Sequence, residues 1–127
     1  MGKIRNGVMK INSKIIECLL PICNKDIYIG KGLRIRKNVI FNCNGGKLII
    51  GQGAFFNSNS SVNAREYIKI GKSFLAGENV HIYDHNHIFI DLLKPVSVQG
   101  FKCKPVNIGD NVWVGSNVTV LGGGNYR

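Results

Sequence analysis

The sequence predicts an all-β fold, a β-solenoid in which short strands wind around a central stack of apolar side chains. Two repeating patterns indicate it. A phrase that begins with isoleucine and glycine starts at Ile29, Ile50, Ile70 and Ile108, so its starts are 21, 20 and 38 residues apart. Inside each interval, apolar or small residues often recur every six positions. Repeats of this kind indicate stacked structural units, each of which buries its apolar face on the next.

The six-residue period explains how such a coil closes. The recurring positions are Ile29, Ile35 and Phe41; Ile50, Phe56 and Val62; Ile70, Ala76 and Ile82; and Ile108, Val114 and Val120. Three hexads make one turn of a triangular prism, and successive coils stack at about 4.8 Å. Glycine and asparagine near the corners tolerate the positive φ that tight turns require. A helix would need apolar spacings of three and four, and the glycines argue against one.

These patterns divide the chain into two parts. Residues 27–127 are the expected β-helix domain. Residues 1–26 are basic and carry no repeat, so they form a short helix ending before Pro21, a disordered start, or a cap on the first coil. The 38-residue interval equals one turn plus an insertion of about 20 residues, which we place at 88–105. An insertion of this length in a compact repeat is usually functional, and we expect it to leave the prism.

Composition limits the possible partners. Seventeen Lys and Arg against seven Asp and Glu give a net charge of +10, which favours an anionic partner. The basic residues are scattered and no nucleic-acid motif accompanies them, so we expect no nucleic-acid partner. Cys18, Cys23, Cys43 and Cys103 form no CxxC pair, which favours free thiols and a cytoplasmic location. No apolar stretch is long enough to cross a bilayer.

Two segments in order resemble one known family. Residues 70–87, which end in Tyr83-Asp84-His85-Asn86-His87, and residues 105–116, which contain Val112-Trp113-Val114-Gly115-Ser116, resemble the hexapeptide-repeat acyltransferases. The nearest members are the sugar O-acetyltransferases of the galactoside, maltose and capsular-polysaccharide type. The resemblance covers residues 27–121. It implies a left-handed parallel β-helix, an acetyl-CoA co-substrate, and homotrimers with active sites between neighbouring prisms.

The resemblance singles out His87 as the catalytic residue. In the resembled enzymes the histidine at this point, at the end of the coil before the loop, is the general base. It takes the proton of the acceptor hydroxyl as that oxygen attacks the acetyl-CoA thioester. His85 is the second catalytic candidate; it and Asp84 either orient the base or bind the acceptor. Asp91, in the loop, is expected to orient the imidazole on the acceptor side. For each of the four, the alternative is an ordinary solvated turn or loop residue.

Other family positions concern the two substrates. Trp113, Gly115 and Ser116 match the segment that lines the pantetheine arm, where a backbone N–H at the serine position donates to the thioester oxygen. Lys104, with Lys102, is placed to meet the phosphates of CoA. Asn57 falls where galactoside-type enzymes hold an asparagine that contacts the acceptor. Eight residues later those enzymes carry an acid, whereas this chain has Arg65, which leaves the identity of the acceptor open.

Some left-handed β-helices are zinc carbonic anhydrases, so a metal site has to be weighed. His81 and His87 are one hexad apart and therefore belong near successive corners of the prism. With His85 they do not easily close a three-histidine site within one chain. We expect no metal.

The sequence thus predicts a cytoplasmic sugar or polysaccharide O-acetyltransferase that uses acetyl-CoA. The resembled enzymes continue after the tryptophan motif with at least one further coil that completes the CoA groove. Here the sequence ends at Arg127, shortly after Val120-Leu121. The alternative is therefore a non-catalytic β-helix relative that assembles or binds sugar as a scaffold.

Overall fold

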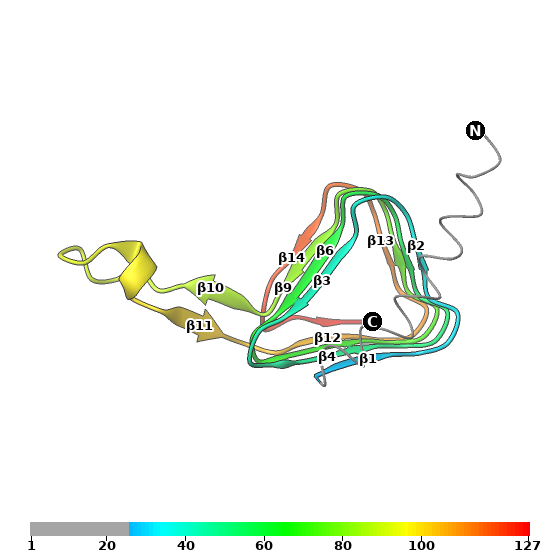
Figure 1. The fold of residues 1–127 in the computed structure, drawn as a ribbon, viewed down its shortest axis with the longest axis horizontal. Helices are drawn as coiled ribbons and strands as arrows, with labels where there is room; N and C mark the ends of the chain where they lie inside the picture. The colour runs from blue at the N-terminus through cyan, green and yellow to red at the C-terminus, as the bar shows by residue number, and fades with distance from the viewer. Residues whose placement is uncertain (1–25) are drawn as a thin grey trace.

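The structure, a computed structural model, describes residues 26–127. The predicted N-terminal helix, disordered start or cap at 1–26 lies outside the described residues, apart from Asp26. From Ile27 onward the chain winds into the coils of a triangular prism, as Figure 1 shows. Four coils are complete, and a fifth begins with one further strand.

Each coil contributes one short strand to each of three parallel faces. The five-stranded face contains β1 (Ile27–Ile29), β4 (Lys47–Ile50), β7 (Tyr67–Ile70), β12 (Val106–Ile108) and β15 (Asn125–Tyr126). The β2–β13 face contains β2 (Arg34–Ile35), β5 (Phe55–Phe56), β8 (Leu75–Ala76) and β13 (Trp113–Val114). The β3–β14 face contains β3 (Ile40–Cys43), β6 (Ser61–Ala64), β9 (His81–Tyr83) and β14 (Thr119–Val120).

The register of these strands confirms the predicted repeat. Ile29 pairs with Ile50, Ile50 with Ile70, and Ile70 with Ile108, so the four phrase starts form one column. The other predicted inward positions pair in the same way on the two remaining faces. The middle coils bury all their members of these rows, whereas the first and last described coils leave several half-buried. The predicted all-β fold, a parallel β-helix of hexapeptide coils with one excursion, is confirmed.

Asparagines form one corner of the prism. Asn38, Asn59, Asn79 and Asn117 occupy the same corner in successive coils with φ between 56° and 62°. Asparagine tolerates this left-handed region better than most residues because its short side chain bonds locally. Here the side chains also bond between coils: the amide of Asn38 donates to Asn59 at 3.0 Å, and that of Asn79 donates to Asn117 at 2.9 Å. The asparagines therefore both form the turn and hold the stacking register.

The excursion leaves the prism as a two-stranded arm. Its strands are β10 (His85–His87) and β11 (Phe101–Cys103), which pair antiparallel, and a short 3-10 turn, η1 (Val96–Val98), lies near its tip. The arm projects from the corner where the β3–β14 face meets the five-stranded face (Figure 1). The prediction that residues 88–105 leave the prism is confirmed. The predicted irregular loop is corrected, because the excursion begins at His85 and its root is a regular antiparallel ladder.

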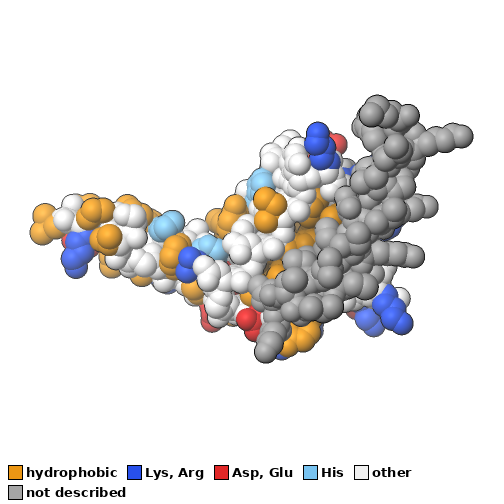
Figure 2. Space-filling model, in the orientation of Figure 1, with side chains coloured by type: hydrophobic (Ala, Val, Ile, Leu, Met, Phe, Trp, Pro, Cys, Tyr) orange, Lys and Arg blue, Asp and Glu red, His pale blue; other side chains and the backbone are white. Residues whose placement is uncertain are grey.

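The arm exposes most of its apolar side chains. Leu92 and Leu93 at the tip are 95% and 96% exposed, and Phe89, Ile90 and Val98 are also exposed. Figure 2 shows these hydrophobic side chains gathered along the projecting arm. A contiguous exposed apolar surface of this kind usually marks an interaction site. Among residues 26–127, no helix has the length and apolar character needed to cross a membrane.

Candidate active site

The root of the arm is organised around one buried carboxylate. Asp84 follows β9 directly and is fully buried, with 0% of its surface exposed. Its oxygens accept the backbone N–H groups of Arg65, Glu66 and Tyr67 at 2.7–3.0 Å. Asp84 also bonds Nδ1 of His85 at 2.9 Å. A carboxylate that receives this many donors is held in one position and offers little to an external ligand.

The sequence left two alternatives for Asp84, to orient a histidine or to bind the acceptor. In the structure its buried oxygens are occupied by the chain itself, including the ring of His85. Burial by itself raises the pKa of the Asp84 carboxyl, but the bonds from His85 and from the three backbone N–H groups outweigh burial. The net effect holds the pKa of Asp84 below its usual value, so the carboxylate stays ionised. In this chain Asp84 holds the ring of His85 through Nδ1.

Both arm histidines lie on one face of the ribbon. His85 pairs with Cys103, and His87 pairs with Phe101, so alternation along the strands puts all four side chains on the same side. The Phe101 ring contacts both imidazoles, with ring centroids 5.4 Å from His85 and 4.4 Å from His87. We call His85, His87, Cys103 and Phe101 the histidine face. The structure thus confirms that His85 and His87 lie together, although on the arm rather than at the end of a coil.

The two imidazoles differ in their surroundings. His85 has Nδ1 on Asp84, its side chain is 15% exposed, and Tyr83 packs edge-on against its ring. His87 is exposed, and within residues 26–127 its ring nitrogens form no hydrogen bond. His81, by contrast, belongs to the prism, where its nitrogens bond Ser61 and Asn79 at 2.8 Å each. Only the arm histidines have a ring nitrogen that is open to a ligand.

Arg65 completes the histidine face from the prism side. Its guanidinium carbon lies 3.6 Å from the centre of the Phe101 ring. Its backbone N–H bonds both oxygens of Asp84, so the residue is fixed by the same carboxylate as His85. Sequence analysis singled out Arg65 only as a departure from the family and did not single out Phe101. No sequence signal places these two residues together, because their contact depends on how the arm folds back.

The opposite face of the arm is basic. Asn86 pairs with Lys102, and this pair points away from the histidine face because successive side chains alternate. A small cavity of about 190 Å³ lies here at the root of the arm, lined by Asp84, His85, Asn86, Lys102, Lys104 and Gly122. The stem of Lys104 passes over Gly123 of the last described coil. The two lysines predicted to meet CoA phosphates therefore lie beside one cavity.

The predicted pantetheine residues lie on a different part of the prism. Trp113 is 75% exposed on the outer side of the β2–β13 face, as expected for an outward residue. A Cβ added to Gly115 would meet no atom within 4 Å, so the surface there is open. Ser116 accepts a hydrogen bond from the Glu78 backbone N–H at 3.1 Å, and its own N–H has no acceptor within residues 26–127. Both features follow from the position of β13, which is the edge strand of its sheet in the described chain.

A single chain does not bring all the predicted residues together. The arm leaves one corner of the prism, whereas β13 with Trp113 lies on the face across from that corner (Figure 1). Asn57 follows β5 on the same far face, and its side-chain oxygen accepts the Ser58 N–H at 2.8 Å. Within one prism, Asn57 and Trp113 are separated from the histidine face.

Within residues 26–127, the side chain of Asp91 bonds no imidazole. Its carboxylate accepts the Leu93 N–H at 3.0 Å and pairs with Lys94 at 3.1 Å. Its backbone also bonds the side chain of Gln99 in both directions. Within one chain this carboxylate shapes the tip of the arm, because a short loop between two strands must satisfy its own backbone groups. The role of Asp91 in orienting the base stays a prediction.

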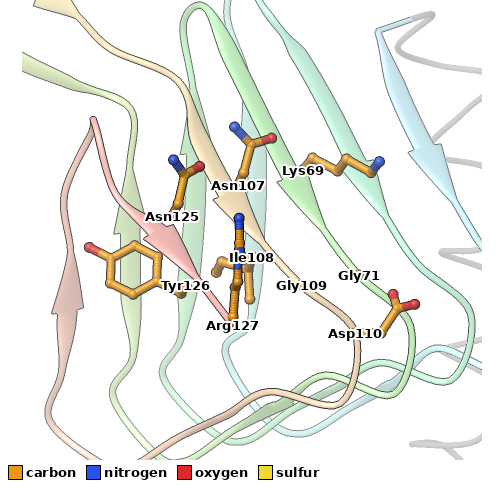
Figure 3. A pocket seen from close by; sticks show the side chains of 9 residues that line it. All are labelled: Lys69, Gly71, Asn107, Ile108, Gly109, Asp110, Asn125, Tyr126 and Arg127. Carbon is orange, nitrogen blue, oxygen red and sulfur yellow. The ribbon is translucent and has the colours of Figure 1, made fainter.

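The larger hollow of the described surface lies away from the histidines. It has a volume of about 430 Å³ and is lined by residues of β7, β12 and β15 and the turns beside them. Figure 3 shows the side chains of Lys69, Asn107 and Asn125, which come from these neighbouring strands, together with Tyr126 and Arg127. None of the predicted site residues lines it. In the part of the chain that the structure describes, no group of three or more His, Cys, Asp or Glu is arranged to hold a metal.

Comparison with known proteins gives three informative similarities. The chain is 30% identical over 95 residues to the probable acetyltransferase Rv3034c of Mycobacterium tuberculosis; the match covers 75% of this chain and 32% of that protein. It is 36% identical over 82 residues to the putative lipopolysaccharide biosynthesis O-acetyl transferase WbbJ of Escherichia coli, covering 54% of this chain and 42% of WbbJ. No family model matches the chain.

The structural similarity points the same way. The fold matches the hexapeptide-repeat containing acetyltransferase VCA0836 of Vibrio cholerae, whose crystal structure is a complex with acetyl-CoA. The TM-score is 0.57 at 29% sequence identity, over 75% of this chain and 53% of that one. The chain therefore spans less than half the length of the two curated relatives and about half of the solved structure.

Proposed function

The chain belongs to the hexapeptide-repeat acyltransferases, and from this we propose that it transfers an acetyl group from acetyl-CoA to a hydroxyl of a sugar or polysaccharide precursor. The observation that carries the proposal is the histidine face, where two imidazoles lie side by side and one is anchored by the buried Asp84. The sugar is proposed from the likeness to WbbJ and from the family resemblance. A cytoplasmic location remains a prediction of the sequence.

The reaction needs a general base and a hydrogen-bond donor that stabilises the negative charge on the carbonyl oxygen. The base removes the proton of the sugar hydroxyl while its oxygen attacks the thioester carbonyl. The carbon–sulfur bond then breaks, and the CoA thiolate leaves and takes up a proton. A positioned base typically contributes ~10²–10⁴-fold to such a step. The free N–H of Ser116 is the proposed donor to the carbonyl oxygen as its charge develops.

His87 is the proposed base. Its ring is exposed and neither ring nitrogen is engaged by residues 26–127, so it can accept a proton from a bound hydroxyl. His85 is the second candidate on a specific observation. Asp84 bonds its Nδ1, which leaves Nε2 as the acceptor, as a carboxylate does in hydrolytic triads. Substituting each histidine separately distinguishes the base from its neighbour.

The remaining parts of the site favour a second copy of the chain. Trp113, Gly115 and Ser116 lie across the prism from the histidine face, so one chain offers the donor side and the acceptor side at different places. We propose a homotrimer in which the arm of one prism approaches the β2–β13 face of the next. The exposed leucines of the arm tip and the exposed Trp113 supply apolar surface for such a contact.

Two measurements test the proposed function. Isothermal titration measures acetyl-CoA binding to the chain, and a thiol-release assay measures transfer to sugar acceptors. We expect binding in the micromolar to millimolar range and acceptor-dependent release of CoA. Lys102→Gln and Lys104→Gln are expected to weaken the binding of acetyl-CoA more than the binding of S-acetylpantetheine, the thioester fragment that lacks the phosphates. If acetyl-CoA does not bind at all, the scaffold alternative replaces the enzyme.

A further inference from the structure

A guanidinium that forms no ion pair within residues 26–127 lies beside the proposed base. The guanidinium of Arg65 is half-buried and stacks on Phe101, the same ring that His87 contacts. Both groups lie within 4.4 Å of that ring centre. Within residues 26–127, Arg65 forms no ion pair with any carboxylate. Its positive charge is therefore open to a ligand on the histidine face.

The carboxylates near Arg65 are already engaged or do not reach it. The carboxylate of Asp84 accepts the backbone N–H groups of Arg65, Glu66 and Tyr67 and bonds the ring of His85. Its oxygens are therefore already engaged. Asp91 is paired with Lys94 at the far end of the arm. Glu66 is exposed and makes no ion pair with its neighbour. None of these described carboxylates therefore forms an ion pair with the Arg65 guanidinium.

The geometry of Arg65 suits a planar anion. One face of the guanidinium is covered by Phe101, so its N–H groups are directed along the plane and away from the ring. A fork of this kind matches a carboxylate with two parallel hydrogen bonds. Because Asp84 fixes the backbone of Arg65 and the ring of His85 together, the fork and the histidines keep a constant spacing. Such preorganisation lowers the cost of binding.

The lysines expected to meet CoA are not part of this feature. Lys102 lies on the opposite face of the arm from Phe101, and Lys104 lies beside the cavity at Gly122. The phosphates of CoA and an anion on Arg65 would therefore occupy different sides of the ribbon. A charge on the histidine face is available to the acceptor.

We propose that the acceptor is an acidic sugar whose carboxylate is bound by Arg65 while its hydroxyl faces the arm histidines. This inference rests on the proposed function for its meaning but is tested separately, by binding. Arg65 is then the residue that selects uronic-acid-type acceptors over neutral ones. Removing a hydrogen bond to a charged group usually weakens binding by ~10–100-fold, and that is the contribution expected of Arg65.

The experiment compares two probes that differ only in the carboxylate. Methyl β-D-glucuronoside and methyl β-D-glucoside are titrated into the chain without acetyl-CoA and followed by nuclear magnetic resonance. We expect the glucuronoside to bind at least tenfold more tightly, with a preference that shrinks as salt is added. Equal affinity for the two sugars, or binding of neither, would overturn the proposal.

Variants assign the preference to Arg65. Arg65→Gln is expected to weaken glucuronoside binding ~10–100-fold and to leave glucoside binding unchanged. Arg65→Lys keeps the charge without the fork, so it is expected to retain part of the preference even if the glutamine variant does not fold. Lys72→Gln, at an exposed lysine of the prism, is the matched control and is expected to keep the full preference. Equal loss of affinity for both sugars in Arg65→Gln, or loss of the preference in Lys72→Gln, would count against the assignment.

Acetyl transfer, measured on the same samples, separates this inference from the proposed function. Selective binding of the glucuronoside without any transfer would support the carboxylate-binding role of Arg65 and refute the proposed acetyltransferase activity. Transfer to the glucoside and the glucuronoside with equal efficiency would support the acetyltransferase activity and refute the selection of acidic acceptors by Arg65.

Discussion

The prism buries its apolar side chains, whereas the arm exposes most of its own. In the prism, each coil covers the apolar row of the coil below, and the middle coils leave no core side chain exposed. On the arm, two paired strands have no third layer to cover them, and the leucines at the tip are almost fully exposed. The middle coils therefore bury their apolar rows within the prism, whereas the arm leaves its apolar side chains exposed in the described chain.

The same contrast separates stability from chemistry. Every polar side chain that we assign to catalysis or acceptor binding on the histidine face belongs to the arm or to its root at Asp84 and Arg65. The prism histidine, His81, is engaged on both nitrogens within the coils. A region with few fixed partners can bind a ligand, because its polar groups have not already been satisfied.

The largest expected effect comes from the proposed base. His87→Ala is expected to lower acetyl transfer by ~10²–10⁴-fold, because the acceptor hydroxyl loses its proton acceptor. Thermal unfolding is expected to stay the same, since the His87 side chain is exposed and its ring packs on Phe101 at the surface of the arm. His85→Ala is expected to cost less, and His81→Ala, in the prism, is the control with the smallest loss. If His85→Ala loses more than His87→Ala, the roles of the two histidines are exchanged.

Next in size is the loss of a core ring in the prism. Phe56 is fully buried and contacts the rings of Phe41 and Phe74, with centroids 5.1 and 5.3 Å away. Phe56→Ala is expected to lower the free energy of unfolding by about 3–5 kcal/mol, because the coils leave a cavity that they cannot close. Urea unfolding measures it, and Phe89→Ala on the arm is the matched control. Similar losses for the two variants would contradict the division between prism and arm.

A smaller effect is expected where the two regions join. Asp84→Asn is expected to lower the free energy of unfolding by about 1.5–3 kcal/mol, the usual size of a hydrogen bond to a charged group. The amide cannot accept all the N–H groups that the carboxylate receives. Hydrogen exchange is expected to increase at Arg65, Glu66 and Tyr67 in this variant. Unchanged exchange at these three amides would show that Asp84 does not anchor the arm.

The pH dependence of stability sharpens the same comparison. Because the pKa of Asp84 is held below its usual value in the folded chain, its contribution is fully present above the pKa of an unfolded aspartate, about 3.9. The contribution is lost as the pH falls from there through the lowered pKa. Denaturant unfolding between pH 6 and pH 3 is expected to show a steeper acid loss for the wild type than for Asp84→Asn. Parallel profiles would contradict it.

The smallest effect on folding is expected at the tip of the arm. Leu92→Ser and Leu93→Ser are expected to change the free energy of unfolding by no more than about 0.5 kcal/mol, because both side chains are already exposed. They are expected to weaken self-association, measured by light scattering over a range of protein concentrations. A wild-type chain that stays monomeric at all concentrations would refute the proposed trimer.

Local patterns were enough to predict the prism. Six-residue spacing of apolar side chains, with asparagine and glycine near the corners, specifies short strands and turns residue by residue. The column from Ile29 to Ile108 could be predicted from the spacing of the isoleucines, because each stacked coil repeats the same strands and turns. The excursion was also predictable as an interruption of that spacing. Its internal structure was not, since an insertion has no period to follow.

The sequence by itself determined the coil and the approximate position of the interruption. It also showed the resemblance of the histidine-containing segment to a family of acyltransferases. The tertiary structure alone decided what those histidines touch. Asp84 is one of many plausible turn residues until stacking brings the backbone of the preceding coil within reach of its oxygens. Arg65 and Phe101 meet only because the arm folds back along an antiparallel register. Contacts between segments depend on where the chain returns, and no local spacing encodes that return.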